Sequence, residues 1–103
     1  KGFDCSAYVQ YVFGKHDAKL PRTADAQVLD GIFVLKSKLK PGDLVFFSTY
    51  ASGASHVGIY AGSGKFWSAS ASRGVVLDSL DTGYWKEHYY GARRVLMENG
   101  ETA

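Results

Sequence analysis

Cysteine and proline are scarce in this sequence, which has one cysteine and two prolines among 103 residues. A single cysteine cannot form an intramolecular disulfide. Either the compartment is reducing, or the thiol is kept free for chemistry in an oxidising one. The hydrophobic share of 46% and the aromatic share of 15% exclude disorder over most of the length. The composition therefore predicts one packed globular domain.

Long apolar runs and a strong charge excess are also missing. No run reaches the roughly 18 apolar residues of a membrane span, and residues 1–4 do not form a secretory leader. Twelve Lys and Arg against ten Asp and Glu give a net charge of +2, short of the basic stripe of a nucleic-acid binder. Because the first residues lead directly into an apolar-periodic segment, we interpret the chain as a piece of a longer precursor.

Two helices are predicted at the start of the chain. After Asp4, a good N-cap residue, apolar side chains recur at helical spacing over residues 4–13. Thr23 is placed to cap a second, shorter helix that runs to about Leu29, where Asp30 and Gly31 end it.

Short segments rich in Val, Ile, Phe and Tyr follow, separated by Gly, Ser and Asp, and this pattern is typical of strands joined by turns. The predicted strands are residues 32–35, 43–48, 56–61, 65–69, 75–78 and 91–96, with a short helical turn within 82–90. Helices followed by sequential strands indicate an α+β domain, with helices packed on a five- to six-stranded, mainly antiparallel sheet. The start of the first helix then lies beside the sheet.

Cys5 is the first candidate for chemistry. A thiol in the first turn of a helix faces unpaired backbone N–H groups and the positive end of the helix dipole, which both stabilise the thiolate. The Asp4 carboxylate next to it opposes ionisation. The alternative is a small buried hydrophobic side chain, which is the usual fate of a lone free cysteine.

A cysteine nucleophile needs a base, and the chain offers three histidines. His56 is the best placed because it begins a predicted strand, where a side chain is rigidly held yet open to a cleft. A solvated histidine at a strand end is the alternative. We expect His16 to be a surface cation in a polar loop and His88 to be a packed histidine among aromatic residues.

Cofactor and metal sites are not indicated. Residues 62–65, Gly-Ser-Gly-Lys, lack the spacing of a phosphate loop and predict a hairpin turn. One cysteine and three scattered histidines give no metal-ligand spacing. We therefore expect neither a cofactor nor a metal.

Four segments in order resemble the NlpC-type cell-wall peptidases, a branch of the papain-like cysteine peptidases. They are residues 2–6 (Gly-Phe-Asp-Cys-Ser), 20–23 (Leu-Pro-Arg-Thr), 39–47 (Leu-Lys-Pro-Gly-Asp-Leu-Val-Phe-Phe) and 56–60 (His-Val-Gly-Ile-Tyr). The resemblance implies a papain-like catalytic domain over residues 1–97, without the N-terminal part that relatives carry, followed by a polar tail at 98–103.

The same resemblance implies a function. Cys5 would be the nucleophile and His56 the general base of a bacterial peptidase, secreted or in the cell envelope, that cuts peptidoglycan stem peptides between D-glutamate and the diamino acid. Asp4 and Ser6 would line the subsite for the free amine of the stem peptide, whose ammonium would neutralise Asp4.

Two departures from the family pattern point to weakened activity. Relatives usually place a histidine at the third catalytic position, which falls here on Ser68, whose hydroxyl has less reach toward the imidazole. The alternative for Ser68 is a plain polar residue without a catalytic role. Relatives also carry an oxyanion-site tyrosine before residue 2. These departures motivate the alternative of an inactive wall-binding module, whereas acyl transfer is disfavoured because permuted acyltransferases place histidine before cysteine.

Overall fold

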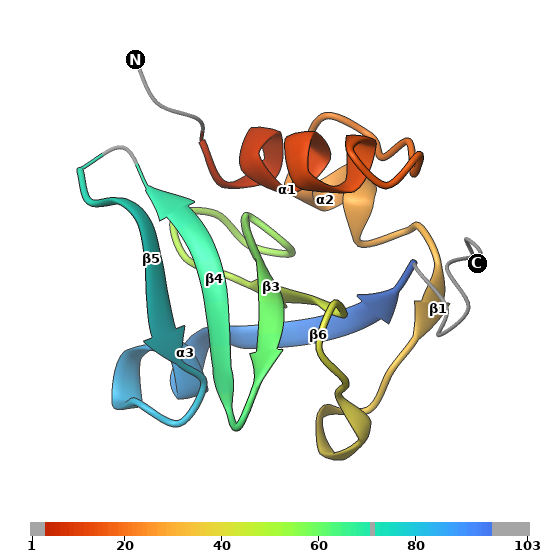
Figure 1. Cartoon of the computed structure of the whole chain (residues 1–103). Helices are drawn as coiled ribbons and strands as arrows, with labels where there is room; N and C mark the ends of the chain where they lie inside the picture. Colours follow the sequence, from red (N-terminus) through yellow and green to blue (C-terminus); the bar gives the residue numbers. More distant parts are fainter. Residues whose placement is uncertain (1–3, 71, 96–103) are drawn as a thin grey trace.

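The computed structural model describes residues 4–70 and 72–95 and forms one α+β unit (Figure 1). Its sheet has six strands in the order β1-β6-β2-β3-β4-β5, and every pairing is antiparallel. This confirms the predicted fold class. The strands are β1 (Ile32–Phe33), β2 (Leu44–Phe47), β3 (His56–Gly62), β4 (Lys65–Ser70), β5 (Gly74–Ser79) and β6 (Tyr89–Arg94).

Helix α1 (Cys5–Gly14) forms where the sequence predicts it. The Asp4 side chain accepts a hydrogen bond from the Ala7 amide at 2.8 Å, so it caps the helix as expected. Val9 and Phe13, one helical turn apart, are almost fully buried against the sheet. Figure 1 shows α1 and α2 (Ala24–Gln27) lying together over one side of the sheet.

The second helix is shorter than predicted. It ends at Gln27 rather than near Leu29, and the Thr23 side chain makes no capping hydrogen bond although Thr23 occupies the N-cap position. Leu29 is 79% exposed. Burial thus holds only the first turn, where Ala24 and Gln27 meet the rest of the protein.

Strand boundaries differ from the prediction mainly at the two ends of the set. β1 keeps only two residues, and a 3-10 turn at Lys36–Lys38, not expected from the sequence, follows it. β6 begins earlier than expected, directly after α3 (Gly83–His88), and Leu96, its predicted end, lies outside the described residues. So does the predicted tail at 98–103.

The sheet carries a hydrophobic core on each face, and we call these the helix-side core and the far-side core. The helix-side core joins α1 to the inward residues of β2 and β3, and includes Cys5, Val9, Leu44, Phe46, Val57 and Ile59. The far-side core includes Val45, Phe47, Phe66 and Leu80, with Trp85 of α3 packed against it. Strand β3 therefore contributes Val57 to one face and His56 to the other.

Gly58 allows the close packing of the far-side core. A Cβ at this position would lie 2.6 Å from the Phe66 ring and 2.7 Å from the Trp67 carbonyl oxygen. The Phe66 ring consequently rests directly on β3, two residues from His56.

No helix among the described residues has the length and the hydrophobicity needed to cross a bilayer.

Candidate active site

Cys5 is the first residue of α1 and is 8% exposed. Burial raises the pKa of its thiol, and the Asp4 carboxylate adds to the rise, while the amides of Val57 and Ser6 oppose it. The helix start alone favours a thiolate, but here burial and Asp4 outweigh it. The resting site therefore holds a protonated thiol.

The helix start still offers hydrogen-bond donors at the sulfur. The Tyr8 amide is bound by the Asp4 carbonyl at 3.0 Å and the Ala7 amide by the Asp4 carboxylate. The amides of Cys5 and Ser6 remain, and both lower the pKa of the thiol. They are the donors available for negative charge that develops beside Cys5.

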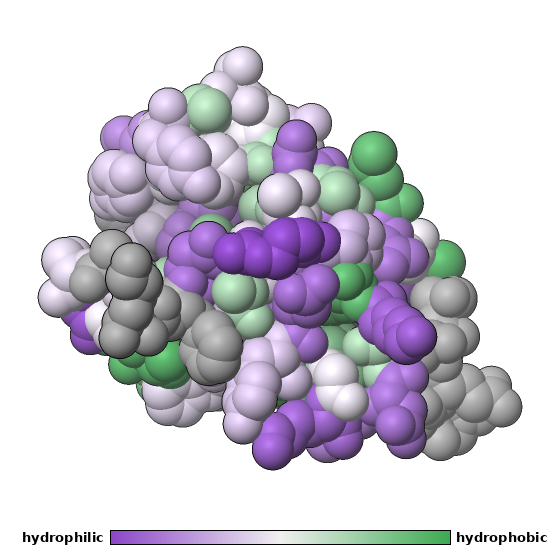
Figure 2. All heavy atoms as spheres, turned by 90° about the horizontal axis from the view of Figure 1, so that it is seen from above, coloured by the Kyte–Doolittle hydropathy of each residue, from purple (hydrophilic) through white to green (hydrophobic). Residues whose placement is uncertain are grey.

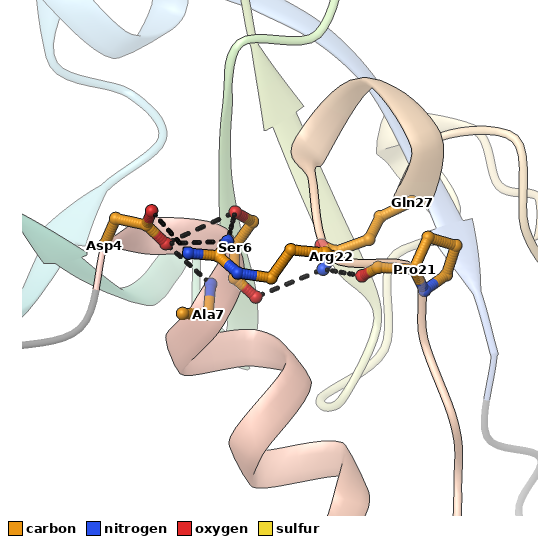
Figure 3. Close-up of polar contacts among 6 residues, drawn as sticks. All are labelled: Asp4, Ser6, Ala7, Pro21, Arg22 and Gln27. Carbon is orange, nitrogen blue, oxygen red and sulfur yellow. Dashed lines mark hydrogen bonds and ion pairs between the residues drawn. The ribbon is translucent and has the colours of Figure 1, made fainter.

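Asp4 and Ser6, the two chain neighbours of Cys5, are tied to Arg22 (Figure 3). Arg22 donates from Nη1 to Asp4 Oδ1 at 3.2 Å and from Nη2 to Asp4 Oδ2 at 3.0 Å. The same Nη1 donates to Ser6 Oγ at 3.0 Å, and Ser6 Oγ donates to Asp4 Oδ1 at 3.3 Å. The hydrogen bond from Arg22 is the main cause that holds the pKa of Asp4 below its usual value. Arg22 thus compensates the carboxylate that the sequence leaves next to the nucleophile.

Two glutamine side chains hold the loop that carries Arg22. The fully buried Gln27 donates from Nε2 to the Ser6 carbonyl at 3.1 Å and to the Pro21 carbonyl at 2.8 Å, as Figure 3 shows. Gln10 on α1 donates to the Leu20 carbonyl at 3.0 Å. The carbonyls of the two residues that precede Arg22 are therefore both held by hydrogen bonds.

His56 opens β3, opposite Phe47 of β2, as predicted for the candidate base. Its ring stacks on Trp85, with the centroids 5.1 Å apart and the planes 26° from parallel, and lies 6.0 Å from the Phe47 ring. Burial lowers the pKa of His56 to about 4, against a smaller opposing effect of Asp78. The imidazole is therefore neutral at pH 7 and able to accept a proton.

The Nε2 atom of His56 is buried and has no hydrogen-bond partner among the described residues. Ser68 lies on the same face of the sheet, because Tyr60 pairs with Phe66 and each strand alternates its side chains. It is 2% exposed, yet no hydrogen bond from Ser68 to the imidazole is found among the residues described. The structure brings Ser68 to the base's side of the sheet without joining the two.

Val57 connects the positions of Cys5 and His56. The Val57 amide acts on the Cys5 sulfur, and His56 is the residue immediately before Val57 on β3. In the described part of the chain no hydrogen bond links the thiol to the imidazole.

A pocket of about 550 Å³ lies beside this pair. It is lined by Asp4, Ser6, Arg22, Thr23, Ala24 and Asp25 on one side and by Tyr50, Ala51, Ser52, Ala54 and Ser55 on the other. Burial, followed by the charges of Cys5 and Asp4, raises the pKa of Tyr50, which places this phenol near the nucleophile. Seen over α1 and α2, the surface is mainly hydrophilic, with strongly hydrophilic side chains across its centre (Figure 2). Asp4 and Ser6 therefore both line this pocket.

The other two histidines lie apart from the nucleophile. His16 is exposed in the turn after α1, as expected. His88 packs on the Tyr84 ring at 4.4 Å and its Nδ1 lies 2.7 Å from the Ser48 carbonyl oxygen, so it is the packed histidine that the sequence indicates. Within residues 4–70 and 72–95, no cluster of three or more His, Cys, Asp or Glu side chains could hold a metal ion.

The sequence did not assign a role to Arg22, Tyr50, Asp78 or Trp85. Arg22 lies in one of the four recognised segments, so its position was visible although its partner was not. The Trp85 contact joins α3 to β3 across the far-side core, and no local spacing indicates it.

Comparison with known proteins identifies the family of this chain. The family model described as NlpC/P60 family matches residues 1–94. The chain is 49% identical over 96 residues to the gamma-DL-glutamyl hydrolase of Bacillus subtilis, covering 91% of this chain and 23% of that protein. It is 45% identical over 100 residues to the murein DD-endopeptidase MepS/murein LD-carboxypeptidase of Escherichia coli, covering 96% and 53%. The chain thus spans between 23% and 53% of the lengths of these relatives.

Solved structures show the same fold. An NlpC/P60 family protein from Bacillus cereus matches with a TM-score of 0.83 and 36% identity, covering 90% of this chain and 32% of that one. RipD from Mycobacterium tuberculosis, described as a non-catalytic NlpC/p60 domain protein adapted to peptidoglycan binding, matches with a TM-score of 0.76 and 28% identity, covering 92% and 68%. The similar proteins thus include both named hydrolases and a named non-catalytic binder.

Proposed function

Because this chain belongs to the NlpC/P60 family, we propose that it is a cysteine endopeptidase that hydrolyses peptidoglycan stem peptides between D-glutamate and the following diamino acid. The observation that carries the proposal is the placement of Cys5 at the start of α1, beside the amide of Val57, with the half-buried His56 directly before Val57 in the chain. The substrate assigns the activity to the bacterial cell envelope or its exterior.

The protonation states define how the reaction begins. Cys5 is a thiol with a raised pKa and His56 is a neutral imidazole. His56 therefore accepts the thiol proton as the sulfur attacks the amide carbon, rather than standing as an imidazolium beside a preformed thiolate. The amides of Cys5 and Ser6 receive the carbonyl oxygen as its negative charge develops.

The second half of the reaction reverses the proton path. The imidazolium gives its proton to the leaving amine, which departs and leaves a thioester on Cys5. A water molecule then attacks the thioester while His56 accepts its proton, and the sulfur leaves and is reprotonated. Asp4 and Ser6 would hold the free amine of the stem peptide on the acyl side of the cleaved bond.

One observation favours a second function, an inactive or weakened wall-binding module. His56 Nε2 lacks a partner in the described structure, and Ser68 stands where relatives usually carry the residue that orients the base. The similarity to RipD, a named non-catalytic member, shows that this fold accommodates such a role.

Release of new amines from purified peptidoglycan distinguishes the two functions. We expect the chain to release amines and the Cys5→Ala variant to release none, with His56→Ala lowering the rate about 10³-fold. Mass spectrometry of the fragments identifies the cleaved bond. His16→Ala, the same change at the exposed histidine, serves as the control and should keep full activity. Equal release by the chain and Cys5→Ala would contradict the peptidase, and sedimentation with the wall without any release would favour the binding module.

A further inference from the structure

The loop between β2 and β3 forms one wall of the 550 Å³ pocket, and we call residues 48–55 the wall loop. The wall-loop residues that line the pocket are Tyr50, Ala51, Ser52, Ala54 and Ser55. The loop is held together by its own hydrogen bonds: the Thr49 amide donates to Ser55 Oγ at 2.8 Å, and Ser48 Oγ donates to the Gly53 carbonyl. Bonds of this kind define the shape of the loop, and its position at the pocket requires a contact outside the loop.

His88 supplies that contact. Among the described residues outside β2 and β3, only His88, the last residue of α3, is hydrogen-bonded to the wall loop. The Ser48 amide donates to the His88 carbonyl at 2.8 Å, and His88 Nδ1 lies 2.7 Å from the Ser48 carbonyl oxygen. Because a carbonyl oxygen can only accept, Nδ1 carries the proton and donates. A reciprocal pair of hydrogen bonds therefore joins His88 to the residue at which the wall loop begins.

An irregularity of the sheet brings these two residues together. The register of β2 on β6 shifts between Phe46 and Phe47, where β6 carries Tyr90 as an extra residue. Beyond the shift, Ser48 meets His88, which belongs to α3 and not to the strand. In a regular antiparallel pair the backbone amide of the facing residue would donate the second hydrogen bond, whereas here the imidazole donates it. The anchor of the wall loop thus depends on the type of one side chain.

Helix α3 in turn fixes the His88 ring. The ring packs on Tyr84 with the centroids 4.4 Å apart, and Tyr84 packs on Trp85 at 5.0 Å. Trp85 is the residue that stacks on His56. Trp85 and His88 are three positions apart on the same short helix, so one element contacts both the candidate base and the wall loop.

We propose that His88 is a positioning residue of the proposed peptidase, whose imidazole holds the wall loop where the loop closes one side of the pocket. His88 is not among the residues that line the pocket, so it acts through the loop. A loop that is already held in place loses little conformational freedom when a ligand binds. The contact should therefore act on substrate binding and not on the attack by Cys5. This effect rests on the proposed function, whereas the position of the loop can be measured without it.

Two substitutions at His88 with opposite effects on the hydrogen bond test the role. His88→Phe keeps a ring against Tyr84 and loses the donor, whereas the amide nitrogen of His88→Asn takes the place of Nδ1 and keeps it. With L-alanyl-γ-D-glutamyl-L-lysine as substrate, we expect His88→Phe to raise KM about fivefold, as the loss of one hydrogen bond does, and to change kcat less than twofold. His88→Asn should keep KM within about twofold of the unaltered chain.

Amide hydrogen exchange measures the wall loop without any substrate. The Thr49 amide should exchange about fivefold faster in His88→Phe and at an unaltered rate in His88→Asn, because its bond to Ser55 Oγ opens more often when the loop loses its anchor. The Tyr60 amide, which donates to the Asp43 carbonyl at 2.8 Å, is the internal control and should keep its protection in both variants. His16→Phe, the same change at an exposed histidine, should alter neither KM nor the exchange of Thr49.

Thermal unfolding verifies that the variants are folded, and His88→Ala replaces His88→Phe if the larger ring disturbs the packing. A KM raised equally in His88→Phe and His88→Asn, a loss confined to kcat, or an unchanged Thr49 exchange in His88→Phe would overturn the role of His88. If the unaltered chain cleaves no peptide while Thr49 exchanges faster in His88→Phe alone, the peptidase proposal fails and the positioning of the wall loop by His88 stands.

Discussion

The two flanks of the active site differ in how completely their polar groups are satisfied. Beside Cys5, the Asp4 carboxylate accepts from Ala7, Ser6 and Arg22. Beside His56 the neighbours are aromatic rings, and Nε2 has no partner within the described residues. The flank beside Cys5 is a polar network at the surface, whereas the flank beside His56 is aromatic and leaves one polar atom without a partner in the described residues. Under the proposed function, substrate recognition belongs to the first flank, and the control of proton transfer to the second.

Acid should lower the stability of the protein through His56, and this is the largest effect that we expect. Unfolded His56 takes up a proton near pH 6.5, whereas the folded imidazole, with a pKa of about 4, does so later. The unfolded state binds more protons in this window, so stability is fully present above about pH 6.5 and falls as the pH drops toward 4. The loss approaches about 3 kcal/mol.

His56→Phe supplies the matched variant for this measurement, because it keeps an aromatic ring and removes the titration. The free energy of unfolding should decrease more between pH 7 and pH 4.5 in the unaltered chain than in His56→Phe. Parallel pH dependence in the two proteins would show that the imidazole is not buried as described.

A hydrogen-bond partner for His56 Nε2 should raise the activity, and we expect this effect to be smaller than that of acid. Ser68→His places a second ring nitrogen on the face that carries His56, and a partner for Nε2 would hold the base in one orientation. We expect kcat on a stem peptide to rise about tenfold, which corresponds to about 1.4 kcal/mol. Ser72→His, the same change at an exposed position, is the control. A fall in kcat, with unfolding unaltered, would argue against Ser68 as the orienting position.

Dismantling the polar flank should have the smallest effect on folding. Asp4→Ala removes the cap on the Ala7 amide and the pair with Arg22, and it should lower the free energy of unfolding by about 1 kcal/mol. Asp4→Asn keeps a capping oxygen and loses only an exposed ion pair, so it should cost less than half as much. Urea unfolding at pH 7 compares the variants. A larger loss in Asp4→Asn than in Asp4→Ala would mean that the charge, not the cap, holds the helix start.

The sequence predicted those features that depend on local pattern. Asp4 was expected as the cap of α1 from its residue type, and the placement of His56 at the start of β3 followed from strand periodicity. The end of α2 was wrong because Leu29 finds no apolar partner, which only the tertiary structure decides.

Contacts between distant segments could not be predicted in this way. Arg22 meets Asp4 across 18 positions of sequence, and Trp85 stacks on His56 from another element. Whether the Asp4 carboxylate or the His56 imidazole has a partner depends on such contacts. The resemblance indicated that Cys5 and His56 act together. It did not indicate that Asp4 pairs with Arg22 or that His56 Nε2 lacks a partner among the described residues.

The strand order also determines when the surroundings of His56 can form during protein synthesis. β6, late in the chain, inserts between β1 and β2, and α3 just before it carries Trp85 onto His56. A nascent chain that has emerged from the ribosome only as far as β5 already contains Cys5 and His56, but its imidazole is still open to water and its sheet lacks an interior strand. The stacking of Trp85 on His56 thus forms only after α3 has been translated, and the sheet is complete only after β6 has followed.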